Sequence, residues 1–107
     1  MAFTGAVPTY ICNTEVKAGQ GEAFEQHIRD VVVPAIVKAR PDLADDWTLL
    51  KPMATESEQP SIYTFLFFGS HPIGDWALGP ILTAAELETF HELTAGQVVW
   101  GFAGAAV

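Results

Sequence analysis

The segment Ser61–Gly69 constrains the fold most, because it is rich in aromatic and β-branched residues and bounded by polar and glycine residues. In an extended strand, alternate side chains point to opposite sides of the sheet. Both faces of this strand are therefore apolar, with Tyr63, Phe65 and Phe67 on one and Ile62, Leu66 and Phe68 on the other. A sheet with one face in water shows polar residues at alternate positions. We therefore expect a sheet that is covered on both faces.

Three further segments have the composition of strands. Pro8–Val16 alternates β-formers with polar residues, and Trp47–Met53 precedes a polar connection that leads into Ser61–Gly69. The last segment, Gln97–Val107, carries bulky Trp100 and Phe102 in alternation with smaller residues. We expect four strands, the middle two of which form a hairpin.

Two segments have helical spacing. Apolar residues recur on one helical face from Glu22 until Arg40-Pro41 ends the helix, and Pro34 inside it should kink or break it. Thr83 to Glu86 has the form of a capping box that starts a second helix, for which Gly96 is placed as a C-terminal cap. Between the third strand and this helix, Ser70–Pro80 is expected to be an irregular loop.

The resulting order, β-α-β-β-α-β, predicts an α+β fold of the ferredoxin-like kind: an antiparallel four-stranded sheet with two helices on one face. The 107 residues suit one domain, 1–107. Because helices of one chain can cover only one sheet face, we expect a second copy of the chain to cover the other. The predicted partner is therefore the chain itself, in a homodimer.

Charge and composition exclude several classes of partner. Five basic residues against thirteen acidic ones give a formal net charge of −8, which argues against nucleic acid or an anionic membrane surface. Apolar runs are too short for a membrane span, and no export leader is visible, so we expect a cytoplasmic protein. A single cysteine, Cys12, excludes a disulfide framework within the chain. No nucleotide-binding, serine-hydrolase or zinc-binding motif occurs, and we expect no cofactor or metal.

The predicted element order over nearly the whole chain, together with the apolar second sheet face, resembles the dimeric α/β-barrel superfamily. That superfamily includes antibiotic-biosynthesis-type cofactor-free monooxygenases, haem-degrading monooxygenases and polyketide cyclases. The nearest local match is the segment 68–76, FGSHPIGDW, which looks like the strand, serine and tryptophan of the monooxygenase branches. The resemblance implies that Trp76 starts the second helix and faces a pocket. It also implies that Asn13 matches a pocket asparagine, and that His91 would be an axial ligand if haem were bound.

Four residues are candidates for catalysis. His71, in the loop after the most apolar strand, could act as base or acid near neutral pH, or could be a loop histidine in water. Asp75 could orient His71 or simply stabilise a turn. Asn13 and Tyr63 could donate hydrogen bonds to a substrate oxygen, or could serve packing within the sheet. The candidate substrate-binding residues are aromatic: Trp76, Trp100, Phe65, Phe67 and Tyr10.

The sequence therefore predicts a small cofactor-independent enzyme that acts on an apolar, aromatic or polyketide-like molecule in a pocket between the sheet and the second helix. The reaction expected is oxygenation, or cyclisation or isomerisation through an enolate, as in a cofactor-free monooxygenase or cyclase. Two alternatives stay open. One is a non-catalytic small-molecule-binding or dimerisation domain, and the other is a haem-binding or haem-degrading monooxygenase that uses His91.

Overall fold

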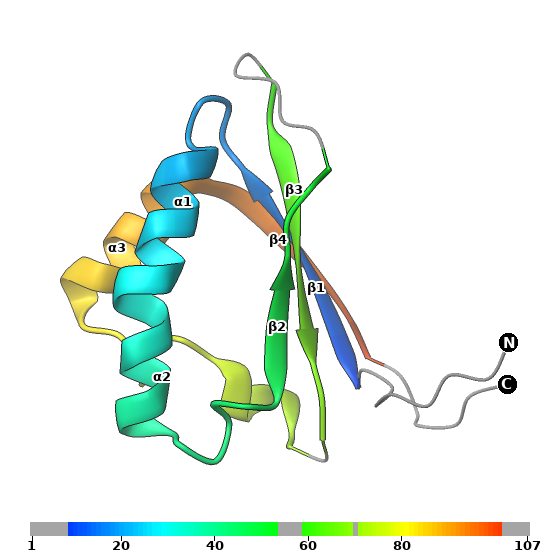
Figure 1. The fold of residues 1–107 in the computed structure, drawn as a ribbon, viewed down its shortest axis with the longest axis vertical. Coiled ribbons are helices and arrows are strands. Elements are labelled where there is room, and N and C mark those ends of the chain that lie inside the picture. Colours follow the sequence, from blue (N-terminus) through cyan, green and yellow to red (C-terminus); the bar gives the residue numbers. More distant parts are fainter. Residues whose placement is uncertain (1–8, 54–58, 70, 102–107) are drawn as a thin grey trace, which may run out of the picture.

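The structure, a computed structural model, describes residues 9–53, 59–69 and 71–101 (Figure 1). Four strands form one sheet: β1 (Tyr10–Val16), β2 (Trp47–Leu50), β3 (Ser61–Phe67) and β4 (Thr94–Gly101). All neighbouring strands are antiparallel, and their order is β2-β3-β1-β4. The helices lie on one side of this sheet. The α+β class with a four-stranded antiparallel sheet is thus confirmed.

The strand order separates strands that run in the same direction. Since β1 and β2 are each antiparallel to β3, they are parallel to one another with β3 between them. In the same way, β3 and β4 are parallel with β1 between them. Each parallel pair is joined through a helical connection that crosses the helix-covered face of the sheet (Figure 1).

The first helical connection runs without a break from Gly21 to Ala39, but its winding changes in the middle. It begins as α1 (Gly21–His27), widens to a π-helical segment η1 (Ile28–Val32) and continues as α2 (Val33–Ala39). Pro34 lies at the start of α2 and has no N–H to donate to the preceding turn. The N–H of Val33 bonds to the carbonyl of Ile28, five residues back. The break expected at Pro34 therefore takes the form of a wider turn just before it.

The second helix, α3 (Ala84–Leu93), begins with the predicted capping box. Thr83 Oγ1 accepts from the Glu86 N–H at 3.2 Å, and Glu86 Oε1 accepts from the Thr83 N–H at 2.9 Å. The expected glycine cap at Gly96 is wrong. Thr94 is already extended, with φ −117° and ψ 154°, so β4 follows α3 directly and Gly96 lies inside the strand, opposite Glu15.

Two predicted strands end earlier than expected. β2 stops at Leu50 rather than Met53, because Pro52 has no N–H for the ladder. β3 stops at Phe67, and Gly69, at φ +81°, takes a backbone conformation that other residues rarely adopt. β4 starts at Thr94 instead of Gln97. Its expected continuation to Val107, like Pro8 and Ser70, lies outside the described residues.

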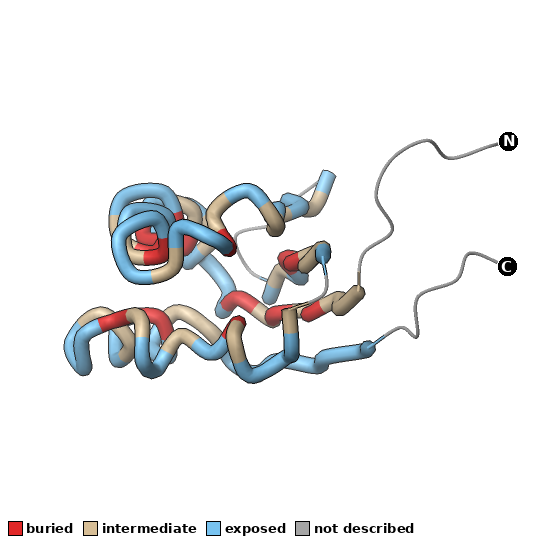
Figure 2. The backbone as a smooth tube through the Cα atoms, turned by 90° about the horizontal axis from the view of Figure 1, so that it is seen from below, coloured by how far each residue is buried: buried red, intermediate tan, exposed pale blue. Residues whose placement is uncertain are grey.

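The two faces of the sheet differ in how far their side chains are buried. The face toward the helices carries buried side chains that pack with the helices into one core, among them Cys12, Thr14, Val16, Tyr63 and Phe65. Figure 2 shows buried stretches on strands and helices alike, and exposed ones on the outer sides of the helices. The opposite face has no helix over it in Figure 1. Four large apolar side chains at positions of that face are exposed: Leu50, Ile62, Val98 and Trp100.

Within the described ranges, none of the helices has both the length and the apolar character that crossing a bilayer requires.

Candidate functional site

A cavity of about 400 Å³ lies between the sheet and the helices. Its walls come from all four strands, from η1 and α2, from α3, and from the loop between β3 and α3. The volume is within the roughly 300–1,000 Å³ typical of small-molecule sites. Six residues of the lining are exposed and mark where the cavity meets solvent: Ile73, Ala77, Gly79, His91, Gln97 and Val99. This position, between the sheet and α3, is where the sequence places a substrate pocket.

One wall of the cavity is a row of stacked aromatic rings. Trp47 and Phe65 have ring centroids 6.0 Å apart at 30°, and Phe65 and Phe67 are 6.0 Å apart at 7°. The row ends on Trp76, whose ring lies 4.6 Å from that of Phe67 at 28°. All four rings line the cavity. Nearly parallel rings at these distances favour a flat ligand that continues the stack.

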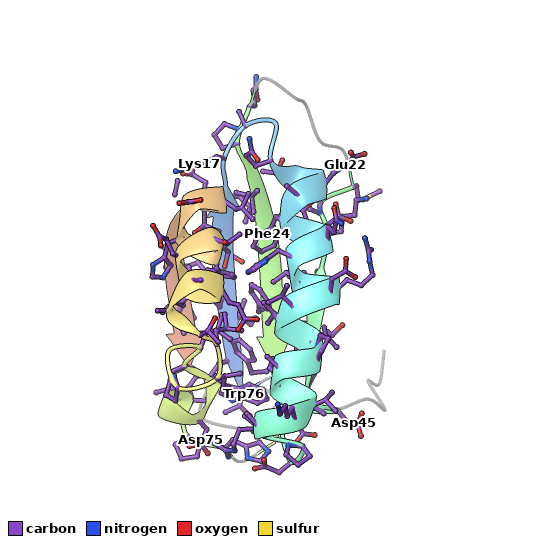
Figure 3. The ribbon with its side chains drawn as sticks, turned by 90° about the vertical axis from the view of Figure 1, so that its left-hand side faces the viewer. Lys17, Glu22, Phe24, Asp45, Asp75 and Trp76 are labelled. Carbon is purple, nitrogen blue, oxygen red and sulfur yellow. The ribbon has the colours of Figure 1, made fainter. Side chains whose placement is uncertain are left out.

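Trp76 owes its position to a one-turn 3-10 helix, η2 (Ile73–Trp76), that follows β3. Its side chain lies between the helical segments in Figure 3, near the end of α2, with Asp75 beside it. The resemblance implied that this tryptophan begins the second helix. Instead it ends η2, and α3 begins eight residues later at Ala84.

Few polar side chains line the cavity. His91 projects from α3, Gln97 comes from β4, and Cys12 comes from the centre of β1. Gln97 is already engaged, since its amide nitrogen donates to Thr14 Oγ1 at 3.0 Å. Burial raises the pKa of the Cys12 thiol, which outweighs the opposing effect of its contact with Thr14, so this thiol stays protonated at neutral pH. Among the described residues that line the cavity, His91 is thus the one whose side chain can both accept and return a proton.

His71 and Asp75, predicted to act together, have different partners. His71 Nε2 lies 2.8 Å from Oδ2 of Asp46, while Asp75 Oδ2 lies 3.4 Å from the Arg40 guanidinium. The same guanidinium pairs with Asp42 at 2.8 Å, an interaction that lowers the pKa of the Asp42 carboxyl. Neither His71 nor Asp75 lines the cavity. His71 instead meets the Trp76 ring edge-on, with centroids 5.7 Å apart at 88°.

Tyr63 and Asn13 also lie away from the cavity lining. The Tyr63 side chain is fully buried, and its hydroxyl donates to Glu25 Oε2 at 2.6 Å. Burial, together with the Glu25 carboxylate, raises the pKa of Tyr63, so the phenol stays protonated. Asn13 lies on the sheet face away from the helices, where its Oδ1 accepts from Thr64 Oγ1 at 2.8 Å.

The structure thus brings together three of the five predicted substrate-binding aromatics: Phe65, Phe67 and Trp76. Trp100 is on the opposite sheet face, next along β4 from cavity-lining Val99. Tyr10 lies on the helix-side face at the end of β1, packed against the core but outside the cavity lining.

Sequence reasoning did not single out Asp46 or Gln97. Asp46 lies 25 residues from His71, and no local spacing connects them. Gln97 was assigned only to the start of a strand, although an amide on the helix-side face of an otherwise apolar strand is a signal that could have identified it. In the described part of the chain, no three His, Cys, Asp or Glu side chains are placed to hold a metal ion.

Comparison of the chain with models of protein families, with curated proteins and with solved structures finds no match in any of the three.

Proposed function

We propose that this chain binds a planar, apolar small molecule in the cavity between sheet and helices, and acts on it by acid–base chemistry without a cofactor. The observation that carries the proposal is the cavity of about 400 Å³ whose wall is a row of four stacked rings and whose lining has few polar groups. Such a lining suits an aromatic or polyketide-like ligand.

The proposed base is His91, because it lines the cavity and the other histidines do not. His71 is bound to Asp46, and the Nε2–H of His27 donates to the carbonyl of Glu86 at 3.1 Å. In the proposed step, the His91 imidazole takes a proton from carbon next to a ligand carbonyl. The C–H electron pair moves into the enolate, and the imidazolium holds the proton.

Two outcomes of this enolate are consistent with the cavity. In isomerisation or cyclisation, the imidazolium returns its proton to the product, so no other reactant is consumed. In oxygenation, the enolate carbon bonds to molecular oxygen, the oxidant, and the resulting peroxide takes the proton from the imidazolium. Loss of water from this hydroperoxide breaks its O–O bond and leaves a second carbonyl on the ligand. Both routes require His91 to form the enolate by removing a proton from the ligand. They differ in whether molecular oxygen is consumed.

Enolisation can be measured directly with 1-tetralone, a flat bicyclic ketone. In D₂O, the hydrogens next to its carbonyl exchange for deuterium only through the enolate. We expect the protein to accelerate this exchange, and the His91→Gln variant to lose rate by about 10²-fold. The His27→Gln variant is the control and should keep the rate. A rate equal to that of buffer, with bound ketone demonstrated, would contradict the acid–base step. A loss confined to His71→Gln would return the role of base to His71.

The fold and assembly proposed with this function are those of a ferredoxin-like dimeric α/β barrel. The order β2-β3-β1-β4, with two interleaved parallel pairs, supports the ferredoxin-like part. The exposed apolar side chains at Leu50, Ile62, Val98 and Trp100 support a second copy of the chain as the cover of the open sheet face.

Two other functions remain as alternatives. The first is a binding or dimerisation domain without catalysis, which would bind 1-tetralone but leave its exchange rate at that of buffer. The second is haem binding through His91. Haem carries two carboxylates, and the described lining of the cavity contains no Lys or Arg to pair with them. The lining therefore fits haem poorly. A shifted Soret band on addition of haemin would support haem binding, and its absence would argue against it.

A further inference from the structure

Trp76 carries a buried hydrogen-bond donor that finds no partner in the described part of the chain. Its side chain is 9% exposed, and among the described residues no acceptor lies within hydrogen-bonding distance of the buried Nε1 atom. Buried polar atoms in proteins are nearly always paired, because an unpaired one keeps the cost of losing water without the compensating bond. An indole N–H is a donor only, so the missing partner must be an acceptor.

The surroundings of this donor belong to the cavity. The Trp76 ring is part of the cavity wall and stacks on Phe67, while the His71 ring meets it edge-on. His71 is in turn held by Asp46 at 2.8 Å. The indole is thus packed on one side by the aromatic row, and it contacts a histidine that is itself held by a hydrogen bond to Asp46.

The charge of the lining indicates what kind of acceptor fits. Of the described residues that line the cavity, none is Lys, Arg, Asp or Glu. The Cys12 thiol stays neutral, because burial raises its pKa. An anionic ligand would therefore lose water without gaining a counter-ion inside the cavity, which is unfavourable. The fitting acceptor is an uncharged oxygen.

We propose that the ligand is a neutral, planar molecule with a carbonyl-type oxygen, and that this oxygen accepts a hydrogen bond from Trp76 Nε1. This inference rests on the proposed function and specifies its ligand class and orientation. Because Nε1 is closed off from water in the structure, the indole must turn within the cavity wall to present its N–H to the ligand. Since water does not reach Nε1 beforehand, the ligand oxygen displaces no competing hydrogen bond there.

A matched pair of probes tests the role of Trp76. Tetralin and 1-tetralone share a flat bicyclic skeleton, and only 1-tetralone carries the oxygen. We expect Trp76→Phe to weaken binding of 1-tetralone about five- to ten-fold and that of tetralin less than about two-fold, because it removes the donor and keeps an aromatic ring. Trp47→Phe, a change of the same kind in the same aromatic row, should weaken both probes equally.

A second readout observes the N–H itself. The indole N–H resonance that is missing from Trp76→Phe identifies Trp76 in the NMR spectrum of the wild-type protein. It should move downfield on addition of 1-tetralone and should not move downfield with tetralin. Equal weakening of both probes by Trp76→Phe, or no downfield shift with 1-tetralone, would overturn the inference and leave the cavity as a ligand site. Failure of both probes to bind the wild-type protein would overturn the proposed function as well.

Discussion

His71 Nε2 lies 2.8 Å from Asp46 Oδ2, and this contact joins the loop after β3 to the turn between α2 and β2. A second contact between the same two segments, Arg40 with Asp75 at 3.4 Å, lies near it. Both segments contribute to the cavity wall, through Trp76 and Leu43. The two polar contacts thus hold the wall together from outside.

The His71–Asp46 contact should be measurable as a coupling. Because both side chains are partly shielded from solvent, with exposures of 23% and 39%, we expect a coupling of about 0.5–1.5 kcal/mol between His71→Ala and Asp46→Ala. Urea unfolding of the two single variants and the double variant measures it. The pair Arg29 and Asp30, 4.0 Å apart and 70% and 57% exposed, is the control and should give a value near zero. Strictly additive losses at His71 and Asp46 would contradict the prediction.

The buried hydroxyl of Tyr63 should stabilise the fold in a pH-dependent way. Its hydrogen bond lowers the pKa of Glu25 below the ordinary value, against the opposing effect of burial. A lowered carboxyl pKa stabilises the folded state above the ordinary pKa, and this contribution is lost as the pH falls through the lowered one. At pH 7, Tyr63→Phe should therefore cost about 1.5–3 kcal/mol, and the difference from wild type should narrow in acid.

Urea unfolding of wild type and Tyr63→Phe across this pH range is the measurement. Tyr10→Phe removes a hydroxyl from a half-buried tyrosine at the other end of the helix-side face, and it controls for the loss of a phenol as such. A stability difference for Tyr63→Phe that stays constant from pH 7 into acid would show that Glu25 is not its partner.

The capping box at the start of α3 should contribute about 1 kcal/mol to the free energy of unfolding. Thr83→Ala removes the oxygen that accepts from the Glu86 N–H, whereas Thr83→Ser keeps it. Thr89 lies within the same helix, where its hydroxyl bonds only to the carbonyl of Ala85, so Thr89→Ala is the matched control. We expect this control to be neutral or slightly stabilising, because alanine favours helix interiors. Equal losses at Thr83 and Thr89 would argue against a specific role for the cap.

Features set by local spacing could be predicted, and contacts between distant loops could not. The period of two in β3 and the capping box at Thr83 depend on a few consecutive residues, and both occur in the structure. Asp75, four residues after His71, was a candidate to orient His71 or to stabilise a turn. Such a spacing brings side chains together on an α-helix, whereas here only Ile73–Trp76 is helical, as a single 3-10 turn. The actual partner, Asp46, depends on where two loops meet after the whole core has packed.

The same limit applies to the cavity. Alternation placed Phe65 and Phe67 together on one face of their own strand, but it could not tell whether Trp100, on the last strand, shares that face. Trp100 was therefore grouped with the substrate-binding residues, although it lies on the face away from the cavity. The face that Trp100 takes depends on the pairing register between strands, which alternation within one strand does not encode.

The open sheet face should mediate dimerisation. Leu50, Ile62, Val98 and Trp100 are 48%, 47%, 55% and 47% exposed, so each has about 1 kcal/mol still to gain from burial. On the same face, Asn13 and Thr64 bond to each other at 2.8 Å, so this polar pair can be covered without losing its hydrogen bond.

Light scattering tests this prediction, and we expect it to give about twice the 11.5 kDa mass of one chain. Trp100→Glu should weaken the dimer by about 100-fold or more, because a carboxylate would lose its water at the interface. Val37→Glu, on α2 on the other side of the sheet and 52% exposed, should leave the dimer intact. A folded wild-type monomer at high protein concentration would show that this face has another role.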